Sequence, residues 1–313
     1  YDNVGIMALS AISSDYFSSG VDLIGEAPNV GRFIPFQYAV ETSTINSACS
    51  IVTPFTYARQ PFDGSVTLQA QNLAGGITDG YTGNFVSLNA SELTIKRDLT
   101  GLDYDNQVIT SGALSPGKVS FNLDLRWDMI EQPATTTQVN LTAITDEVTE
   151  FVGSPSPVSL GSTDMRFGRL AMQNVFGSEL IDLVMPMRAE YFDGTNFIVN
   201  IDDGCTTIDH AAIPTQLLVT PDLSGGSSTV TVIQTTAIGG DLNVQLTKPG
   251  AENTGDIRVI PNLIQSGDSW LQYDWNGIDE LSDGNLYDDN PMGTATFGIF
   301  KGDSRQIYYR QIY

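Results

Sequence analysis

The residue types best suited to chemistry are concentrated in one acidic stretch, Asp274–Asn290, which reads DWNGIDELSDGNLYDDN. Calcium binds six to eight hard oxygen ligands, and short loops supply them from Asp and Asn around a glycine that permits a sharp bend. Asp274, Asn276 and Gly277 begin such a spacing. The stretch therefore predicts a candidate calcium site, with a solvated acidic loop as the alternative. The candidate ligands are Asp274, Asn276, Asp283, Asn285, Asp288 and Asp289.

This stretch does not have the pattern of an EF-hand, because Ile278 stands at the fifth position and no Glu stands at the twelfth. Trp270 and Trp275 lie close to it and could serve as a ligand platform, but we expect both side chains in the core. Two other acidic turns, Asp202–Asp203 and Asp103–Asn106, are expected to be solvated surface loops.

Hydrolytic chemistry is disfavoured by the residues present. His210 is the only histidine, and no G-x-S-x-G pattern surrounds a serine. Among the 37 acidic residues no pair stands out as the two carboxylates of a glycoside hydrolase. We therefore expect a structural role for His210 and no enzymatic activity.

Composition narrows the class of protein further. The 37 acidic and 14 basic residues give a formal net charge of −23, and such a field repels phosphate backbones and anionic lipids. Nucleic acids are therefore not expected as partners, and no segment reaches the roughly 20 apolar residues of a membrane span. The small share of charged residues, with many Thr, Ser, Gly and Asn, favours strands over helices.

Strand patterns follow one another along the chain. Residues 185–192 alternate between two faces with a period of two, Asp193–Gly194 supplies a turn, and Phe197–Val199 returns as the partner strand. We expect an all-β protein of tandem antiparallel β-sandwich domains, Ig-like or jelly-roll-like, with few or no helices. The other predicted strands are Val4–Ser13, Phe36–Glu41, Phe55–Tyr57, Ser65–Asn72, Asn89–Arg97, Lys118–Trp127, Val139–Thr145, Gln216–Thr220, Ser228–Thr235, Asp241–Thr247, Ile257–Ile260, Leu271–Trp275, Ala295–Lys301 and Ile307–Arg310.

Two domains are expected from the length of 313 residues. The stretch Gly153–Pro157 (GSPSP) is the best linker, since two prolines among small residues do not build a packed element. This places a first β-sandwich at residues 33–152 and a second at residues 153–313. Residues 1–32 contain a predicted strand at Val4–Ser13 and a loop with a short strand within Tyr16–Gly31, and we expect them to pack on the first domain. The chain opens within a strand pattern and shows no leader, so we expect it to be part of a longer protein.

Four blocks of sequence form a recognisable series. The first consists of RFGRL, QNVFGSEL, P-x-R-A-E-Y-F-D-G-T-x-F and DDGCT, between residues 166 and 206. The other three are Val30–Val40, Cys49–Phe85 and Ala295–Tyr313. Together they resemble the C-terminal region of MshQ-type proteins from the gene cluster of the MSHA (mannose-sensitive haemagglutinin) type IV pilus of marine and aquatic bacteria. The resemblance covers most of the chain and implies that residues 1–32 are terminal strands of a preceding repeat.

The resemblance implies an extracellular or bacterial cell-surface protein that is associated with a pilus and has no established chemistry. It predicts a non-enzymatic structural module that supports pilus assembly or adhesin presentation, with pilus or other cell-surface proteins as partners. The alternative is a calcium-dependent adhesin domain that binds surface glycans or cells. Where the family has a compact D-x-D-G-D-G loop, this chain is interrupted by Ile278–Ser282, so its ligand geometry departs from that pattern.

Cys49 and Cys205 are the only cysteines, and their spacing excludes a C-x-x-C motif. In an exported protein such a pair favours a disulfide over two buried, inert thiols. With the domain division above, this bond would join the two domains.

Overall fold

A computed structural model of the chain describes residues 3–97, 106–127, 131–148, 157–209, 217–278 and 286–298. These residues form mostly β-strands, with one four-residue helix, α1 (Leu263–Ser266), and short 3-10 turns, so the all-β prediction is confirmed. The chain divides into two compact units. Unit 1 comprises Tyr1–Ala48, Pro61–Asp128 and Thr135–Met165, and unit 2 comprises Cys49–Gln60, Met129–Ala134 and Arg166–Tyr313.

Unit 1 is built on an antiparallel sheet in the order β3 (Gln37–Ile45), β5 (Phe62–Gln71), β8 (Lys118–Arg126) and β7 (Asn106–Ser115). A second sheet, of four strands, includes β10 (Val158–Arg166), β9 (Thr135–Ile144) and β6 (Leu93–Lys96) in this order. The predicted period of two is realised, because β5 and β8 bury alternate side chains and pair Val66 with Phe121 across the strands. The two sheets meet where the Ser47 and Thr163 hydroxyls share a hydrogen bond of 2.8 Å.

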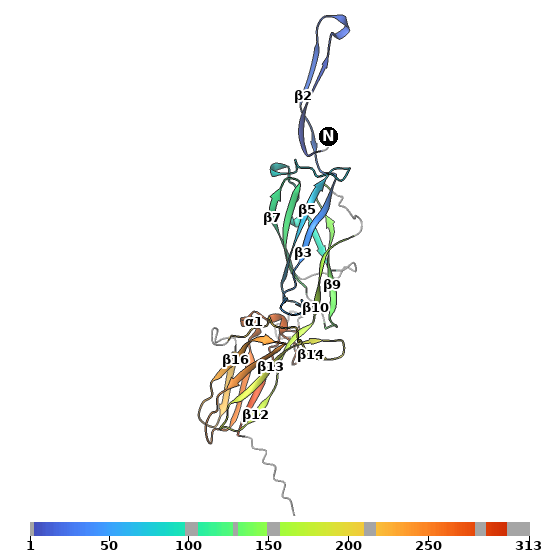
Figure 1. The fold of residues 1–313 in the computed structure, drawn as a ribbon. Coiled ribbons are helices and arrows are strands. Elements are labelled where there is room, and N and C mark those ends of the chain that lie inside the picture. The colour runs from blue at the N-terminus through green and yellow to red at the C-terminus, as the bar shows by residue number, and fades with distance from the viewer. Residues whose placement is uncertain are drawn as a thin grey trace, which may run out of the picture. The chain divides into compact units, whose positions relative to one another are not determined.

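Unit 1 also carries a two-stranded antiparallel hairpin of β1 (Gly5–Ser13) and β2 (Leu23–Phe33), drawn in dark blue in Figure 1. The predicted strand at residues 4–13 is confirmed as β1. The loop and short strand predicted within Tyr16–Gly31 correspond to the hairpin turn and β2, which is longer than predicted. Gly25, Pro28 and Gly31 interrupt the pattern of β2, and its pairing with β1 has two register irregularities.

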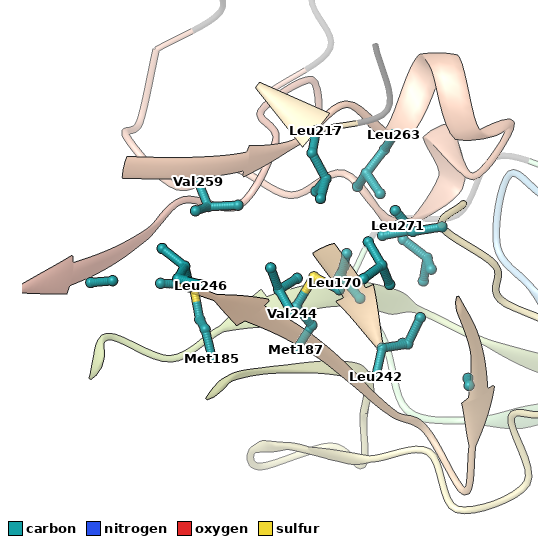
Figure 2. Close-up of a cluster of buried hydrophobic side chains, with 14 of the residues drawn as sticks. Leu170, Met185, Met187, Leu217, Leu242, Val244, Leu246, Val259, Leu263 and Leu271 are labelled. Carbon is teal, nitrogen blue, oxygen red and sulfur yellow. The ribbon is translucent and has the colours of Figure 1, made fainter. Parts of the chain in front are cut away.

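Unit 2 has two sheets that enclose a common core. The first runs β11 (Gly168–Met172), β13 (Leu183–Phe192), β17 (Asp241–Leu246) and β16 (Val230–Ile238), with β14 (Phe197–Val199) also on β13. The second runs β12 (Val175–Gly177), β19 (Gly293–Phe297), β18 (Gly255–Pro261) and β15 (Leu217–Leu223), and its β12–β19 pair is parallel. Figure 2 shows Met185, Met187 and Val244 from the first sheet facing Leu217 and Val259 from the second.

The hairpin predicted at residues 185–199 is confirmed as β13 and β14. Its turn is fixed by Asp193, whose Oδ1 accepts hydrogen bonds from the backbone N–H groups of Thr195 (2.7 Å) and Asn196 (2.8 Å). These bonds hold the pKa of the Asp193 carboxyl below its ordinary value. Gly194 takes a φ of 105°, a backbone conformation that residues with a Cβ rarely adopt.

Some expectations from the sequence differ from the structure, and others concern residues outside the described ranges. Leu271–Trp275 was predicted as a strand, which is wrong: it holds the end of a 3-10 turn, Ser269–Leu271, and a loop. Strands β7, β10, β11 and β12 were not predicted. Residues 153–156 of the expected linker, the terminal strand at Ile307–Arg310 and the turn at Asp103–Asp105 lie outside the described residues. Among the residues that are described, none belongs to a helix with the length and apolar character of a membrane span.

Candidate functional site

The candidate calcium loop of unit 2 uses its described acidic and amide side chains to shape its own backbone. Asp274 Oδ1 accepts a hydrogen bond from the Gly277 N–H at 2.6 Å, and Gly277 takes a φ of 74°. Asp289 accepts from the Trp275 N–H at 2.8 Å and from Asn276 Nδ2 at 3.1 Å. Asp274, Asn276 and Asp289 are therefore brought into one loop, and their oxygens act as turn acceptors.

The other predicted ligands are placed differently. Asp288 lies with both carboxylate oxygens buried, while its backbone carbonyl accepts from Gln272 Nε2 at 2.6 Å. Asp283 and Asn285 lie outside the described residues. Across the described ranges no three or more His, Cys, Asp or Glu side chains are grouped as a metal site would need. Calcium binding here stays a prediction.

A cation from far along the chain does reach this loop. The Arg59 guanidinium donates to three carbonyl oxygens, those of Tyr287 (2.9 Å), Trp270 (3.2 Å) and Gln272 (2.8 Å). It also stacks over the Phe167 and Tyr287 rings, with 5.3 Å to the second ring centroid. Arg59 itself has a φ of 68°, a left-handed conformation that costs about 1 kcal/mol or more for a residue with a Cβ. This strain is stored where residues 49–60 join the C-terminal loop.

A second arginine is enclosed by aromatic rings. The Arg169 guanidinium lies 3.8 Å from the centroid of Phe197, 5.1 Å from Tyr273 and 4.9 Å from Trp275. Its charge is balanced by Glu190 at 2.9 Å on the paired strand. This aromatic cage is thus filled by the protein's own cation and connects β11, β14 and the acidic loop.

The two tryptophans near the loop differ in exposure. Trp270 packs against the core of unit 2, as predicted. Trp275 is 42% exposed, so the expectation that it is a core residue is wrong. Its position follows from Asp289, which accepts the Trp275 N–H and holds the backbone at the surface.

A buried carboxylate lies beside the disulfide. Asp203 is fully buried and accepts from the Tyr57 hydroxyl (2.9 Å), the N–H groups of Cys205 and Thr206 (both 2.9 Å) and the Thr206 hydroxyl (2.6 Å). Burial, together with this carboxylate, raises the pKa of Tyr57 well above its ordinary value. The expectation of a solvated turn is therefore wrong for Asp203, since the turn folds inward to cap its own backbone.

The neighbouring residue completes the same polar network. Asp202 pairs with Arg166 at 2.9 Å, and Arg166 also donates to Asn200 Oδ1. Asn200 in turn donates to the Tyr57 hydroxyl at 2.7 Å. Asp202 is thus engaged in an ion pair, where we expected a solvated carboxylate.

The predicted disulfide between Cys49 and Cys205 is present, 156 residues apart in sequence. Both cysteines belong to unit 2, because residues 49–60 pack there although they precede most of unit 1 in the chain. The bond therefore fixes that segment within unit 2. The sequence division had suggested that the bond joins two domains, but both of its cysteines lie in unit 2.

A second buried carboxylate, Asp268, follows α1. Ser266 and the backbone N–H of Thr207 donate to it, but its Oδ2 has no hydrogen-bond partner among the described residues. Burial raises the pKa of Asp268 to about 7, and the Asp203 charge adds to the shift. Asp268 is therefore the described carboxyl whose charge changes near neutral pH.

No catalytic arrangement is found in the described part of the chain. His210 lies outside it. Unit 1 has an open groove of about 550 Å³, but its lining has no acid, base or aromatic ring. The groove is lined by Asn89, Ala90, Ser91, Leu93, Gln107, Ile109 and Ser111.

Arg59 and Arg169 were not identified from the sequence, because candidate site residues were sought among the more numerous acidic residues. The available signal was rarity: only 14 basic residues occur, and Arg59 and Arg169 each follow closely on aromatic residues. Their partners lie more than 20 residues away, and the carbonyl partners of Arg59 more than 200, so spacing alone did not reveal them.

Two matches to one protein family cover most of the chain. Residues 3–153 match the description "DUF6701, third domain", and residues 166–312 match "DUF6701, fourth domain". No curated protein matches the chain.

Several solved structures show weak likeness. The I9–I11 tandem from titin has a TM-score of 0.30 at 6% identity, covering 78% of this chain and 61% of that one. The D0–D1 domain of Intimin gives a TM-score of 0.18 at 10% identity, covering 85% and 99%. Domains 5–6 of the S-layer protein SbsC give 0.20 at 13% identity, covering 72% and 91%. The chain spans about three fifths of the titin tandem, and its fold class rests on its own sheets.

Proposed function

From its membership of the DUF6701 family, of which it carries the third and fourth domains, we propose a structural role for the chain. It is a non-enzymatic module of an extracellular bacterial surface protein. The resemblance of its sequence blocks to MshQ-type proteins supports a place with the MSHA type IV pilus, in pilus assembly or adhesin presentation. Pilus or other cell-surface proteins are then its partners.

One observation carries the proposal: in unit 2 the side chains best suited to hold a ligand are used for internal contacts. Arg59 donates hydrogen bonds to three carbonyl oxygens. Arg169 forms an ion pair with Glu190 and contacts three aromatic rings. Asp203 accepts four hydrogen bonds from its own unit. Such satisfied polar clusters make a domain rigid and specify one packing, which is what a structural module requires.

An extracellular location is supported by the disulfide. Disulfides persist in oxidising environments such as the periplasm and the cell surface, and they are rare in the cytosol. The net charge of −23 favours solubility and disfavours anionic partners.

Exchange of the module in cells tests the proposal. Residues 3–298 would be replaced by an unrelated rigid tandem of two β-sandwich domains, with the rest of the protein unchanged. A structural module predicts that surface display and pilus number are largely restored. Loss of both, with the exchanged protein stably present at the surface, would show that these domains supply a specific activity.

The exposure of Trp275 favours a second candidate, a calcium-dependent domain that binds glycans or cells. Its ring is 42% exposed beside Asn276 and Asp289 in the candidate calcium loop. Extracellular calcium modules bind with dissociation constants of about 0.1 to 1 mM. Calorimetric titration with calcium tests this candidate, which predicts saturable binding that the paired variants Asp274→Asn and Asp289→Asn remove. No heat of binding up to about 10 mM calcium would eliminate it.

A further inference from the structure

Most of the β1–β2 hairpin of unit 1 is open to solvent, since every residue from 8 to 29 is exposed. Its strands pair only with each other, in a sheet of two. Beyond Gly5 no side chain of either strand is buried, although the hairpin carries many large apolar residues. Isolated two-stranded hairpins are marginally stable in water, so this one requires a partner surface.

The two faces of the hairpin differ in charge. Residues directly opposite in an antiparallel pair share a face, and the face alternates along each strand. Leu9 pairs with Ala27 and Leu23 with Ser13, which places them on one face. We name this the apolar hairpin face, and it consists of Met7, Leu9, Ala11, Ser13, Leu23, Gly25, Ala27 and Val30.

The apolar hairpin face contains no charged residue. The opposite face carries the Ser10–Glu26 pair, and next to it the Ile12–Ile24 pair. Contiguous exposed apolar surface of this kind marks an interaction site in a soluble protein. Both faces expose large apolar side chains, and they differ in the charge of Glu26. Because burial of the Glu26 carboxylate without a paired charge would cost free energy, an apolar partner fits the uncharged face.

The foot of the hairpin is fixed to unit 1. Val4 is buried, and Asn3 Oδ1 accepts hydrogen bonds from the N–H groups of Val4 (2.9 Å) and Gly80 (2.6 Å). At the end of β2, Arg32 makes a two-pronged ion pair with Glu147, at 2.5 and 2.7 Å. The hairpin therefore leaves the unit from an anchored base, next to residue 3 (Figure 1).

The order of domains in the family identifies the occupant. The third-domain match begins at residue 3, at the foot of the hairpin, and in the family's numbering the domain before it is the second. A strand of nine residues is about 30 Å long, comparable with one side of a β-sandwich domain. We propose that the apolar hairpin face packs against the family's second domain and fixes it to unit 1. This inference rests on family membership and not on the pilus role.

Hydrogen–deuterium exchange tests the proposal in two chain lengths, residues 1–313 and a longer chain that also carries the second domain. We expect the backbone amides of residues 5–33 to exchange at least tenfold more slowly in the longer chain. The double variant Leu9→Lys/Leu23→Lys should abolish this difference. Leu9 and Leu23 are 51% and 54% exposed in unit 1, so unit 1 itself should remain folded.

The double variant Ile12→Lys/Ile24→Lys is the matched control. These residues are 62% and 60% exposed on the opposite face, and the control should keep the protection. Equal exchange in both chain lengths would overturn the proposal, as would protection lost only in the control. Concentration-dependent dimerisation of the 1–313 chain that Leu9→Lys/Leu23→Lys abolishes would also overturn it, because the occupant would then be a second copy.

Discussion

At the scale of single residues, the few cations of this acidic chain hold unit 2 together. Arg59 lies in a strained backbone conformation. Its guanidinium donates to the carbonyl oxygen of Tyr287, in the loop where calcium was expected, and to those of Trp270 and Gln272 just before that loop. It supplies positive charge to that loop from within the chain. Acidic side chains shape the turns of this loop, and one guanidinium connects the loop to residues 49–60.

Substitution of Arg59 tests this role. Arg59→Ala should lower the free energy of unfolding by about 2–4 kcal/mol, because three partly buried carbonyl acceptors lose their donor. Arg59→Lys should recover only part of the loss, since an ammonium lacks the planar fork that reaches several acceptors. Denaturant unfolding monitored by tryptophan fluorescence measures both. Equal stability of Arg59→Ala and the unchanged protein would contradict the role.

Asp268 predicts a pH dependence of stability. The pKa of the folded state is about 7 and that of an ordinary Asp is 3.8, so between these values the folded state binds more protons than the unfolded state. Stability should therefore fall as the pH rises from about 4 to 7, by up to about 4 kcal/mol at 1.4 kcal/mol per pH unit. Asp268→Asn should flatten this slope in thermal unfolding.

The exposed Asp222 on β15 provides the control for this experiment. Asp222→Asn should leave the slope unchanged. If Asp268→Asn also leaves it unchanged, the buried carboxyl does not control the pH response.

At the scale of elements, the sequence predicted correctly those strands that bury one face and expose the other to solvent. β5, β8 and β13 alternate cleanly because their sheets cover a core on one side, and the turn at Asp193–Gly194 is encoded locally. β7 was missed because its many polar residues lie on an edge strand that is specified by pairing with β8. The segment Leu271–Trp275 has strand-like residues, but carbonyls at 270 and 272 bond to Arg59.

The candidate site was predicted only in its composition. The clustering of Asp274, Asn276 and Asp289 follows from sequence proximity and turn chemistry. The burial of Asp203 and the cage around Arg169 depend on contacts between distant segments, which no local pattern encodes.

The segment at residues 49–60 depends on its covalent link. Closure of a loop of 156 residues lowers the entropy of the unfolded chain and is worth about 5 kcal/mol in the chain-entropy model. The double variant Cys49→Ser/Cys205→Ser should lose about 3–5 kcal/mol in denaturant unfolding. Reductant should destabilise the unchanged protein equally and leave the double variant unaffected. Unequal losses would mean that the serines disturb packing beyond the bond.

At the scale of the whole molecule, the disulfide determines which residues bear force when the two ends of the chain are pulled apart. Force passes from Cys49 to Cys205 through the bond, so the residues between them are excluded from extension. This covalent loop encloses residues 61–128 and 135–165 of unit 1. A surface module that bears load would keep these strands protected.

Single-molecule stretching measures this protection. Reductant should lengthen the fully extended chain by about 500–550 Å, since 156 residue steps are released at about 3.5 Å each. The Cys49→Ser/Cys205→Ser variant should show the longer extension without reductant. A length that is independent of reductant would exclude shielding by the bond.

The most direct test of the structural account is ligand binding by the whole chain. Residues 1–313 would be applied to glycan arrays and host cells, once with about 1 mM calcium and once with chelator, beside the variant Trp275→Ala. The account predicts no saturable binding in either condition and no difference between the two proteins. Saturable, calcium-dependent binding that Trp275→Ala abolishes would contradict it and establish the loop at residues 274–289 as a ligand site.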